Sequence, residues 1–136
     1  MMPIATPFQH RASAAGLTEE LIRKVIPAFY RKVRLDPVLG PVFAEAIGDE
    51  WDHHIERIIQ FWLTATRLGS GYESRNFLPA HLRHARIHAD QLPRWLELFR
   101  ETTAEYCSRE AATVLVDIAQ RMAETIQVGL SRRQGQ

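Results

Sequence analysis

The sequence predicts an all-α protein, and three observations support this fold class. Apolar residues recur every three or four positions along most of the chain, which is the pattern of amphipathic helices. No segment alternates apolar and polar residues for the length of a strand, and there is no Asn-Gly hairpin turn. The 136 residues, 1–136, suit a single domain with one core, because a domain usually contains about 100–200 residues.

The N-terminal part of the chain predicts a lead-in and one long helix. Residues 1–16 are mixed in composition and contain proline, so we expect a flexible lead-in, and 131–136 are the expected flexible tail. Thr18 is the expected N-cap of a helix that continues to about Leu35. Pro27 lies inside this helix and is expected to kink it or split it, because proline removes a backbone donor.

The next segments predict a bend followed by a second long helix. Residues 36–48 contain two prolines and two glycines, which favours a bend with at most a turn or two of helix. Asp49 is the expected cap of a helix over 50–68, and Gly69 is expected to close it. Residues 69–80 are expected to form a loop.

The C-terminal half predicts three further helices. A short helix is expected around 78–86, and Asp90 is the expected cap of a longer helix that continues to about Tyr106. Ser108 is the expected cap of the last helix, 109–130, whose apolar residues form one stripe. The whole pattern corresponds to five or six helices.

Composition and charge exclude several function classes. Seventeen basic and sixteen acidic residues give a net charge of +1, so no overall charge attracts nucleic acid or a membrane surface. Cys107 is the single cysteine, which excludes an internal disulfide and a metal site built from several cysteines. No apolar run approaches the about 18 residues of a membrane span, and no secretory signal pattern opens the chain, so we expect a cytoplasmic location.

The six histidines are candidate metal ligands, because histidine is the commonest such ligand in proteins. The spacing of His81, His84 and His88 would place three imidazoles on one face of a continuous helix. His53 and His54 lie on the preceding long helix. One hypothesis is therefore a helical metal-binding protein, with zinc as the candidate ion. The alternative is that each histidine is a solvated surface residue.

The 50–68 helix is apolar on two faces, which implies two separate contacts. One stripe consists of Trp51, Ile55, Ile59 and Trp62, and the other of His54, Ile58, Phe61 and Ala65. The second stripe suits either a large flat apolar ligand, with His54 as its polar contact, or further core. Tyr30 and Trp95 also lie on apolar stripes, where their donors bind either a ligand or a backbone carbonyl. A helical interaction module without a cofactor therefore also remains open.

Taken together, these residues resemble the group III truncated haemoglobins of bacteria. The matching blocks are AFYRKVRLDPVLGPVF at 28–43, W-x-x-H at 51–54 running into QFW at 60–62, Tyr72 with His81 nine residues on, and RWLELF at 94–99. They occur in the family's order and cover about residues 20–100. The chain has no Gly-Gly pair, and this absence also agrees with group III.

The resemblance implies a truncated globin fold, a two-over-two helical sandwich around a haem b group. It implies that His81 is the proximal ligand of the haem iron, with His84 as the rival for that role. The distal residues that would stabilise a bound ligand are Tyr30, Trp95 and His54. The residues implied to contact the haem itself are Phe43, Arg57, Ile58 and Phe61.

The resemblance also implies a function. The chain is expected to bind O₂ and other small ligands, among them NO, CO and peroxide, in a pocket rich in hydrogen-bond donors. Two or three donors at about 1–1.5 kcal/mol each would slow O₂ release, which suits NO or peroxide detoxification, redox chemistry or sensing better than transport. The sequence contains no GxGxxG motif, so an electron donor would be a separate reductant. The expected assembly is a monomer or a weak dimer.

Overall fold

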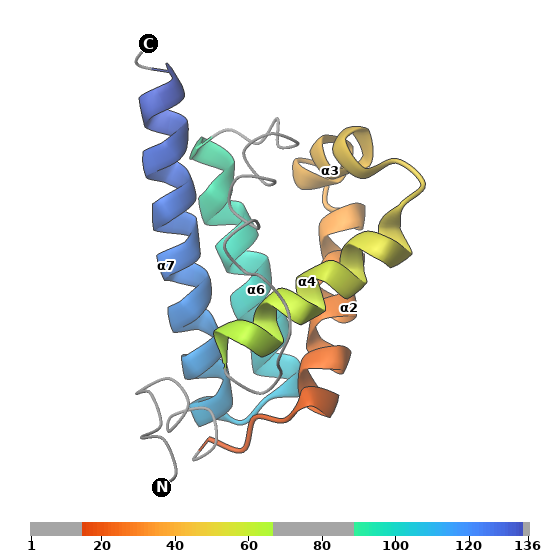
Figure 1. Ribbon diagram of the computed structural model, residues 1–136, viewed down its shortest axis with the longest axis vertical. Helices are drawn as coiled ribbons and strands as arrows, with labels where there is room; N and C mark the ends of the chain where they lie inside the picture. The colour runs from red at the N-terminus through yellow and green to blue at the C-terminus, as the bar shows by residue number, and fades with distance from the viewer. Residues whose placement is uncertain (1–14, 67–88, 135–136) are drawn as a thin grey trace, which may run out of the picture.

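The prediction of an all-α fold is confirmed. The structure is a computed structural model that describes residues 15–66 and 89–134, with side chains as far as 127. Every regular element in these two ranges is helical, comprising five α-helices and one short 3₁₀ helix. Figure 1 shows α6 and α7 running side by side, with α4 crossing α2 on the other side of the molecule.

The first described helix is α2, Glu19–Leu35, and it begins where the sequence predicts. The Thr18 hydroxyl oxygen accepts a hydrogen bond from the Leu21 amide at 3.1 Å, which confirms the predicted N-cap. Pro27 does not split α2, which continues as one helix of 17 residues. Seven buried side chains hold this helix against its neighbours, namely Ile22, Val25, Ile26, Ala28, Phe29, Tyr30 and Val33.

The second helix, α3, Leu39–Ile47, is longer than predicted. Its nine residues make about two and a half turns at 3.6 residues per turn, where a turn or two was expected. The Asp36 side chain explains the difference, because its Oδ2 atom accepts the amides of Val38 at 3.0 Å and Leu39 at 2.9 Å. Asp36 is therefore the C-cap of α2, and its side chain also binds the N-cap residue and the first residue of α3.

Gly40 permits the close approach of α3 to the end of α2. A Cβ atom at this position would lie 2.6 Å from the carbonyl oxygen of Arg34, well inside the contact distance of any real side chain. Gly48, with a φ of 61°, ends α3 in a conformation that favours glycine.

The third helix, α4, Trp51–Ala65, has a start that the sequence analysis placed wrongly. Glu50 rather than Asp49 occupies the N-cap, and no side-chain hydrogen bond caps the helix there. The helix ends at Thr66, where the hydroxyl group donates to the Trp62 carbonyl at 2.8 Å. Gly69, the predicted end, lies outside the described residues, and so does the helix predicted around 78–86.

The last two helices, α6, Leu92–Tyr106, and α7, Arg109–Gln134, form an antiparallel pair. Asp90 lies within the 3₁₀ turn η2, Ala89–Gln91, so its predicted role as the cap of α6 is wrong. Ser108 is confirmed as the cap of α7, since its Oγ accepts the Ala111 amide at 3.1 Å. The last helix extends four residues past the predicted end at 130.

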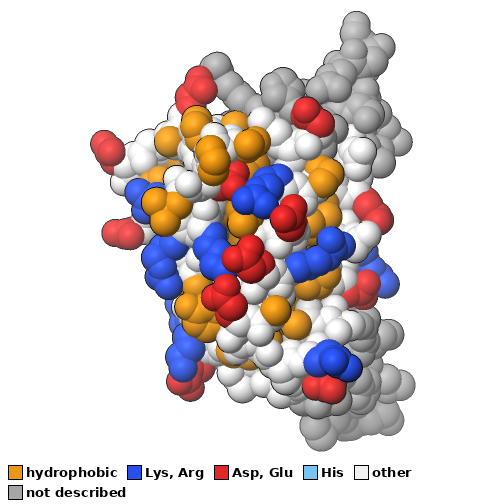
Figure 2. Space-filling view, turned by 180° about the vertical axis from the view of Figure 1, so that it is seen from behind, with side chains coloured by type: hydrophobic (Ala, Val, Ile, Leu, Met, Phe, Trp, Pro, Cys, Tyr) orange, Lys and Arg blue, Asp and Glu red, His pale blue; other side chains and the backbone are white. Residues whose placement is uncertain are grey.

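One hydrophobic core joins the helices, and ion pairs reinforce it at the surface. Lys32 of α2 pairs with Glu101 at 3.1 Å and with Glu105, both on α6. Arg23 of α2 pairs with Glu56 of α4 at 3.0 Å. Figure 2 shows basic and acidic side chains interspersed with apolar ones, without a large area of one sign on that face. Among the described helices, none has both the length and the apolar character needed to cross a membrane.

Candidate functional site

Tyr30 is the centre of a group of side chains contributed by four helices. Its side chain is 2% exposed, and four rings surround it, of which Phe29 of its own helix is nearest at 4.8 Å. The ring centroid lies 6.0 Å from Phe43 of α3, and 6.2 Å and 6.5 Å from Trp51 and His54 of α4. Trp95 of α6 completes the group: its ring meets Phe29, the neighbour of Tyr30 on α2, edge-on at 5.5 Å, and its indole lowers the pKa of the Tyr30 hydroxyl. We call these five residues, Tyr30, Phe43, Trp51, His54 and Trp95, the Tyr30 cluster.

The Tyr30 hydroxyl stays protonated across the physiological pH range. Burial raises the pKa of this hydroxyl well above its ordinary value, and the Trp95 indole offsets only part of that rise. An indole N–H can only donate, so in a hydrogen bond between the two the Tyr30 oxygen is the acceptor. A hydroxyl group can donate one hydrogen bond as well as accept, so Tyr30 retains the capacity to donate its own hydrogen to a ligand.

Trp95 is held in place by packed aromatic rings. Its ring lies parallel to Phe99, with 6.0 Å between centroids, and Phe99 lies parallel to Trp62 of α4 at 5.2 Å. We call these three residues, Trp95, Phe99 and Trp62, the aromatic stack. The edge-to-face contact of Phe29 with Trp95 at 5.5 Å supports the stack from α2. The indole therefore has little freedom to turn toward another acceptor.

The α4 residues predicted for the site fall on two faces of that helix. His54 is partly buried, its Nε2 atom is shielded from solvent, and its ring meets Trp51 edge-on at 6.1 Å. Ile58, one turn on, is 1% exposed, and Phe61 is partly buried with its ring against Trp62. Arg57 is exposed at the surface, so it does not join the Tyr30 cluster.

The predicted proximal side lies outside the described residues. This applies to His81, His84 and His88, which carried both the iron-ligand prediction and the zinc hypothesis. His53 is exposed while its neighbour His54 faces the cluster. In the ranges 15–66 and 89–134, no three His, Cys, Asp or Glu side chains are grouped as a metal site would require.

Two contacts next to the site were not anticipated from the sequence. Asp36 is buried and pairs with Arg94, the residue before Trp95, with Oδ1 lying 2.9 Å from Nε and 2.7 Å from Nη2. The guanidinium of Arg34 lies 4.6 Å above the ring of Trp51. In the sequence Asp36 was only the first residue of the predicted bend, although an acidic residue before a proline-rich turn is also a typical cap.

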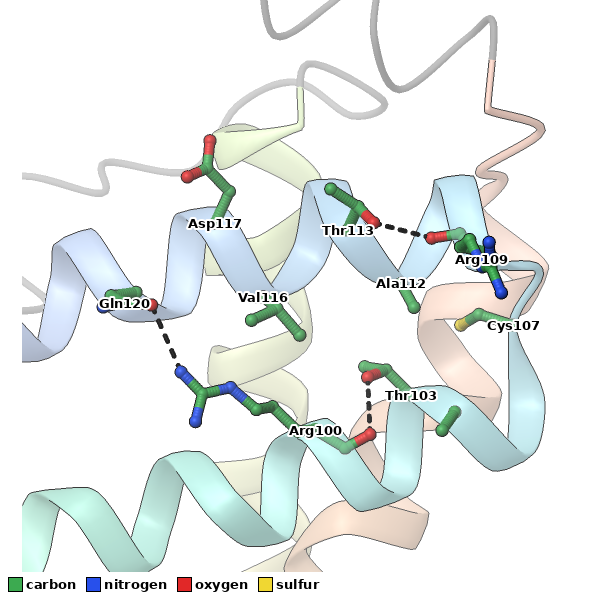
Figure 3. Close-up of a pocket in the computed structure, with 10 residues that line it drawn as sticks. Arg100, Thr103, Cys107, Arg109, Ala112, Thr113, Val116, Asp117 and Gln120 are labelled. Atoms are coloured by element: carbon green, nitrogen blue, oxygen red, sulfur yellow. Dashed lines mark hydrogen bonds between the residues drawn. The ribbon is translucent and has the colours of Figure 1, made fainter.

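A separate pocket of about 570 Å³ lies between α6 and α7, away from the Tyr30 cluster (Figure 3). Arg100, Cys107 and Arg109 are among its lining side chains, and Arg100 donates to Gln120 across it at 3.3 Å. Burial raises the pKa of the Cys107 thiol, which disfavours the reactive thiolate. The pocket shares no residue with the Tyr30 cluster.

The helical architecture and the convergence of Tyr30, His54 and Trp95 from α2, α4 and α6 define a truncated globin. The chain is 34% identical over 114 residues to a group 3 truncated haemoglobin of Campylobacter jejuni, covering 82% of this chain and 89% of that protein. It therefore belongs to the group III truncated haemoglobins. The crystal structure of the group III truncated haemoglobin from Campylobacter jejuni superposes with a TM-score of 0.77 at 32% identity, over 84% of this chain and 91% of that one. No family model matches the sequence.

Proposed function

We propose that the chain binds haem b through His81 and holds a diatomic ligand, with O₂ as the first candidate, beside the Tyr30 hydroxyl. The observation that carries the proposal is the buried Tyr30 side chain, whose ring lies edge-on to His54 at 6.5 Å and whose hydroxyl can donate a hydrogen bond. Such a polar group in an apolar interior is costly unless it has a partner to bind. Membership of the group III truncated haemoglobins supports haem as the cofactor.

The side chains on this face of the protein suit a haem group. A porphyrin is a large flat apolar surface, and buried apolar side chains are offered by Phe43, whose ring meets Tyr30, and by Ile58, one helical turn after His54. Arg57 is exposed on α4 and is proposed to reach a haem propionate from outside. Phe61 is proposed as a further contact along the same helix. A haem held by one neutral imidazole supplies an iron atom with an open position for a small ligand.

The chain's own contribution is a directed pair of hydrogen bonds. Trp95 is proposed to donate to the Tyr30 oxygen, and Tyr30 in turn to the ligand. Successive hydrogen bonds polarise one another, so the Trp95 bond strengthens the donor that faces the ligand. His54, edge-on to the Tyr30 ring, is proposed as a secondary donor or as a gate to solvent. CO accepts hydrogen bonds weakly, so this arrangement favours O₂.

Slow release follows from this donor chemistry and points to a role other than transport. Each hydrogen bond contributes about 1–1.5 kcal/mol, and 1.4 kcal/mol corresponds to a tenfold change in a rate or affinity. A site that retains O₂ in this way suits detoxification of NO or peroxide, other redox chemistry, or sensing. Repeated turnover would need electrons from a separate reductant, because the sequence has no nicotinamide or flavin motif. We propose a cytoplasmic monomer as the acting form.

The first experiment is the absorption spectrum of the purified protein. A Soret band is expected in the wild type, retained in His84→Ala and His88→Ala, and lost in His81→Ala unless imidazole is added. A colourless wild-type protein that takes up no haem would refute the proposed cofactor. Loss of the band in His84→Ala alone would move the iron ligand to that residue.

The proposed detoxification of NO is tested separately on the haem-loaded protein. We expect NO to be consumed in the presence of O₂ and a reductant, and Tyr30→Phe to slow that consumption. Tyr106→Phe is the matched control, because it removes a hydroxyl group from an exposed tyrosine outside the Tyr30 cluster. Consumption no faster than that of free haem would leave ligand sensing as the better proposal.

A further inference from the structure

Asp36 is a buried carboxylate that binds three structural elements at once. Its Oδ2 atom accepts the first amides of α3, from Val38 and Leu39. Its Oδ1 atom accepts the Nε and Nη2 groups of Arg94, in the first turn of α6, at 2.9 Å and 2.7 Å. Asp36 itself is the C-cap residue of α2. One side chain, 2% exposed, therefore ties the end of α2 to the beginnings of α3 and α6.

The same three helices carry the side chains that meet at the Tyr30 cluster. Tyr30 lies on α2, Phe43 on α3, and Trp95 directly follows Arg94 on α6. The direction of the Trp95 indole relative to Tyr30 depends on where the first turn of α6 sits against the end of α2. The Asp36–Arg94 ion pair joins the end of α2 to the first turn of α6, and Arg94 directly precedes Trp95 in the sequence.

The geometry of the Asp36–Arg94 ion pair suits the positioning of a neighbouring side chain better than a contribution to the overall stability of the fold. Asp36 is buried but Arg94 is 39% exposed, so desolvation of the carboxylate and solvent screening of the guanidinium leave the pair a small net contribution to overall stability. Such pairs fix orientation well, because a guanidinium group with two donors on one carboxylate has a narrow range of allowed directions. Arg94 also pairs with Glu97 of its own helix at 3.0 Å, which holds the guanidinium group in place from the other side.

We propose that Asp36 and Arg94 are positioning residues that hold the Trp95 indole in its place beside α2, where its ring meets Phe29 edge-on at 5.5 Å. The proposal rests on the function proposed above for the significance of that position, but the position itself is measurable without it. Arg94 and Asp36 touch neither ligand nor cofactor in this scheme. They act only through Trp95, so their loss should resemble a displacement of the Trp95 indole.

The test uses two variants of Arg94. Arg94→Gln leaves the Asp36 side chain able to accept the amides of α3, and Arg94→Lys keeps the positive charge but lacks the planar set of N–H donors of a guanidinium group. Lys32→Gln is the matched control, because Lys32 also joins α2 to α6 through Glu101 and Glu105 but does not adjoin Trp95. The first readout is the indole N–H resonance of Trp95 in the ¹H–¹⁵N spectrum of the protein as purified, assigned with Trp95→Phe. The second is the O₂ off-rate of the haem-loaded protein beside the CO off-rate.

In Arg94→Gln we expect the Trp95 indole resonance to shift and its hydrogen exchange to accelerate. The O₂ off-rate should rise by no more than it does in Trp95→Phe, with the CO off-rate unchanged. Arg94→Lys should restore part of both signals, and Lys32→Gln should leave both at their wild-type values. An unaltered Trp95 resonance in Arg94→Gln, or an equal shift in Lys32→Gln, would overturn the proposal.

The two proposals fail in different ways. If the wild type takes up no haem, the proposed function fails while the indole resonance still tests the positioning role. If haem binds and Tyr30→Phe releases O₂ faster, but Arg94→Gln behaves as the wild type in both readouts, the positioning role alone is wrong.

Discussion

The hydrogen bond proposed between Trp95 and Tyr30 predicts that these two residues act as a unit, and a double-mutant cycle tests this. Tyr30→Phe removes the proposed acceptor of a buried indole N–H that the aromatic stack holds in place. A buried donor left without a partner costs about 1–3 kcal/mol. Replacing both partners by apolar groups is far less costly, because neither polar group is then stranded. The double variant Tyr30→Phe/Trp95→Phe should therefore be more stable than the sum of its single variants implies.

We expect a coupling free energy of about 1 kcal/mol between the two sites. Urea unfolding of the four proteins, followed by circular dichroism, gives the free energy of unfolding for each corner of the cycle. Tyr106→Phe is the control, since it removes an exposed hydroxyl group and should leave stability unchanged. Stability changes that add within about 0.5 kcal/mol would refute the reasoning, because independent sites behave in that way.

The rate of ligand release can be measured on the same four proteins. Tyr30→Phe should raise the O₂ off-rate about tenfold in stopped-flow measurements, since it removes the donor that faces the ligand. Trp95→Phe should raise it less in the wild-type background, and should add nothing once Tyr30 is already phenylalanine. Two independent donors would instead give off-rate changes that multiply. An equal rise in the CO off-rate would indicate easier steric access in place of lost hydrogen bonding.

Two further predictions concern the corner between α2 and α3. Gly40→Ala should destabilise the fold by about 1–3 kcal/mol in urea unfolding, because the added Cβ would lie 2.6 Å from the Arg34 carbonyl oxygen. An unchanged urea midpoint for Gly40→Ala would mean that the backbone between α2 and α3 can move apart to admit the added Cβ. Burial alone would raise the pKa of Asp36, but the hydrogen bonds from the Leu39 amide and from Arg94 lower it overall. A lowered folded-state pKa gives stability that is present above the unfolded value of about 3.9 and lost as pH falls through the folded value. Asp36→Asn should therefore flatten the acid limb of a stability profile below about pH 4, and an unchanged limb would contradict this.

The order and type of the described helices could be predicted because apolar spacing reports directly which face of each segment is buried. The caps at Thr18 and Ser108 were predicted correctly, and those at Asp49 and Asp90 were not. Each of the two incorrect predictions placed the cap one residue too early, and the residue that occupies the N-cap makes no side-chain capping bond. Where no side chain caps a helix, tertiary packing determines which residue is the first of the helix. A local sequence pattern cannot predict that packing.

The candidate site shows the same division between local and long-range information. Periodicity placed Tyr30 and Trp95 on buried faces, and the resemblance to a family assigned them to one pocket. Neither could indicate that the indole acts on the pKa of the Tyr30 hydroxyl, because pairing between α2 and α6 depends on how the helices dock. The Asp36–Arg94 pair spans 58 positions in sequence, so it was equally hidden. The assignment of His81 stays a prediction, since that residue lies outside the described ranges.

The aromatic stack also bears on how a gas molecule travels through the protein. Small molecules cross a close-packed interior only through brief openings made by side-chain motion. Three large rings packed face to face, with Phe99 fully buried between the other two, open such gaps rarely. We therefore expect a small ligand to reach the Tyr30 hydroxyl by a route that avoids these three rings.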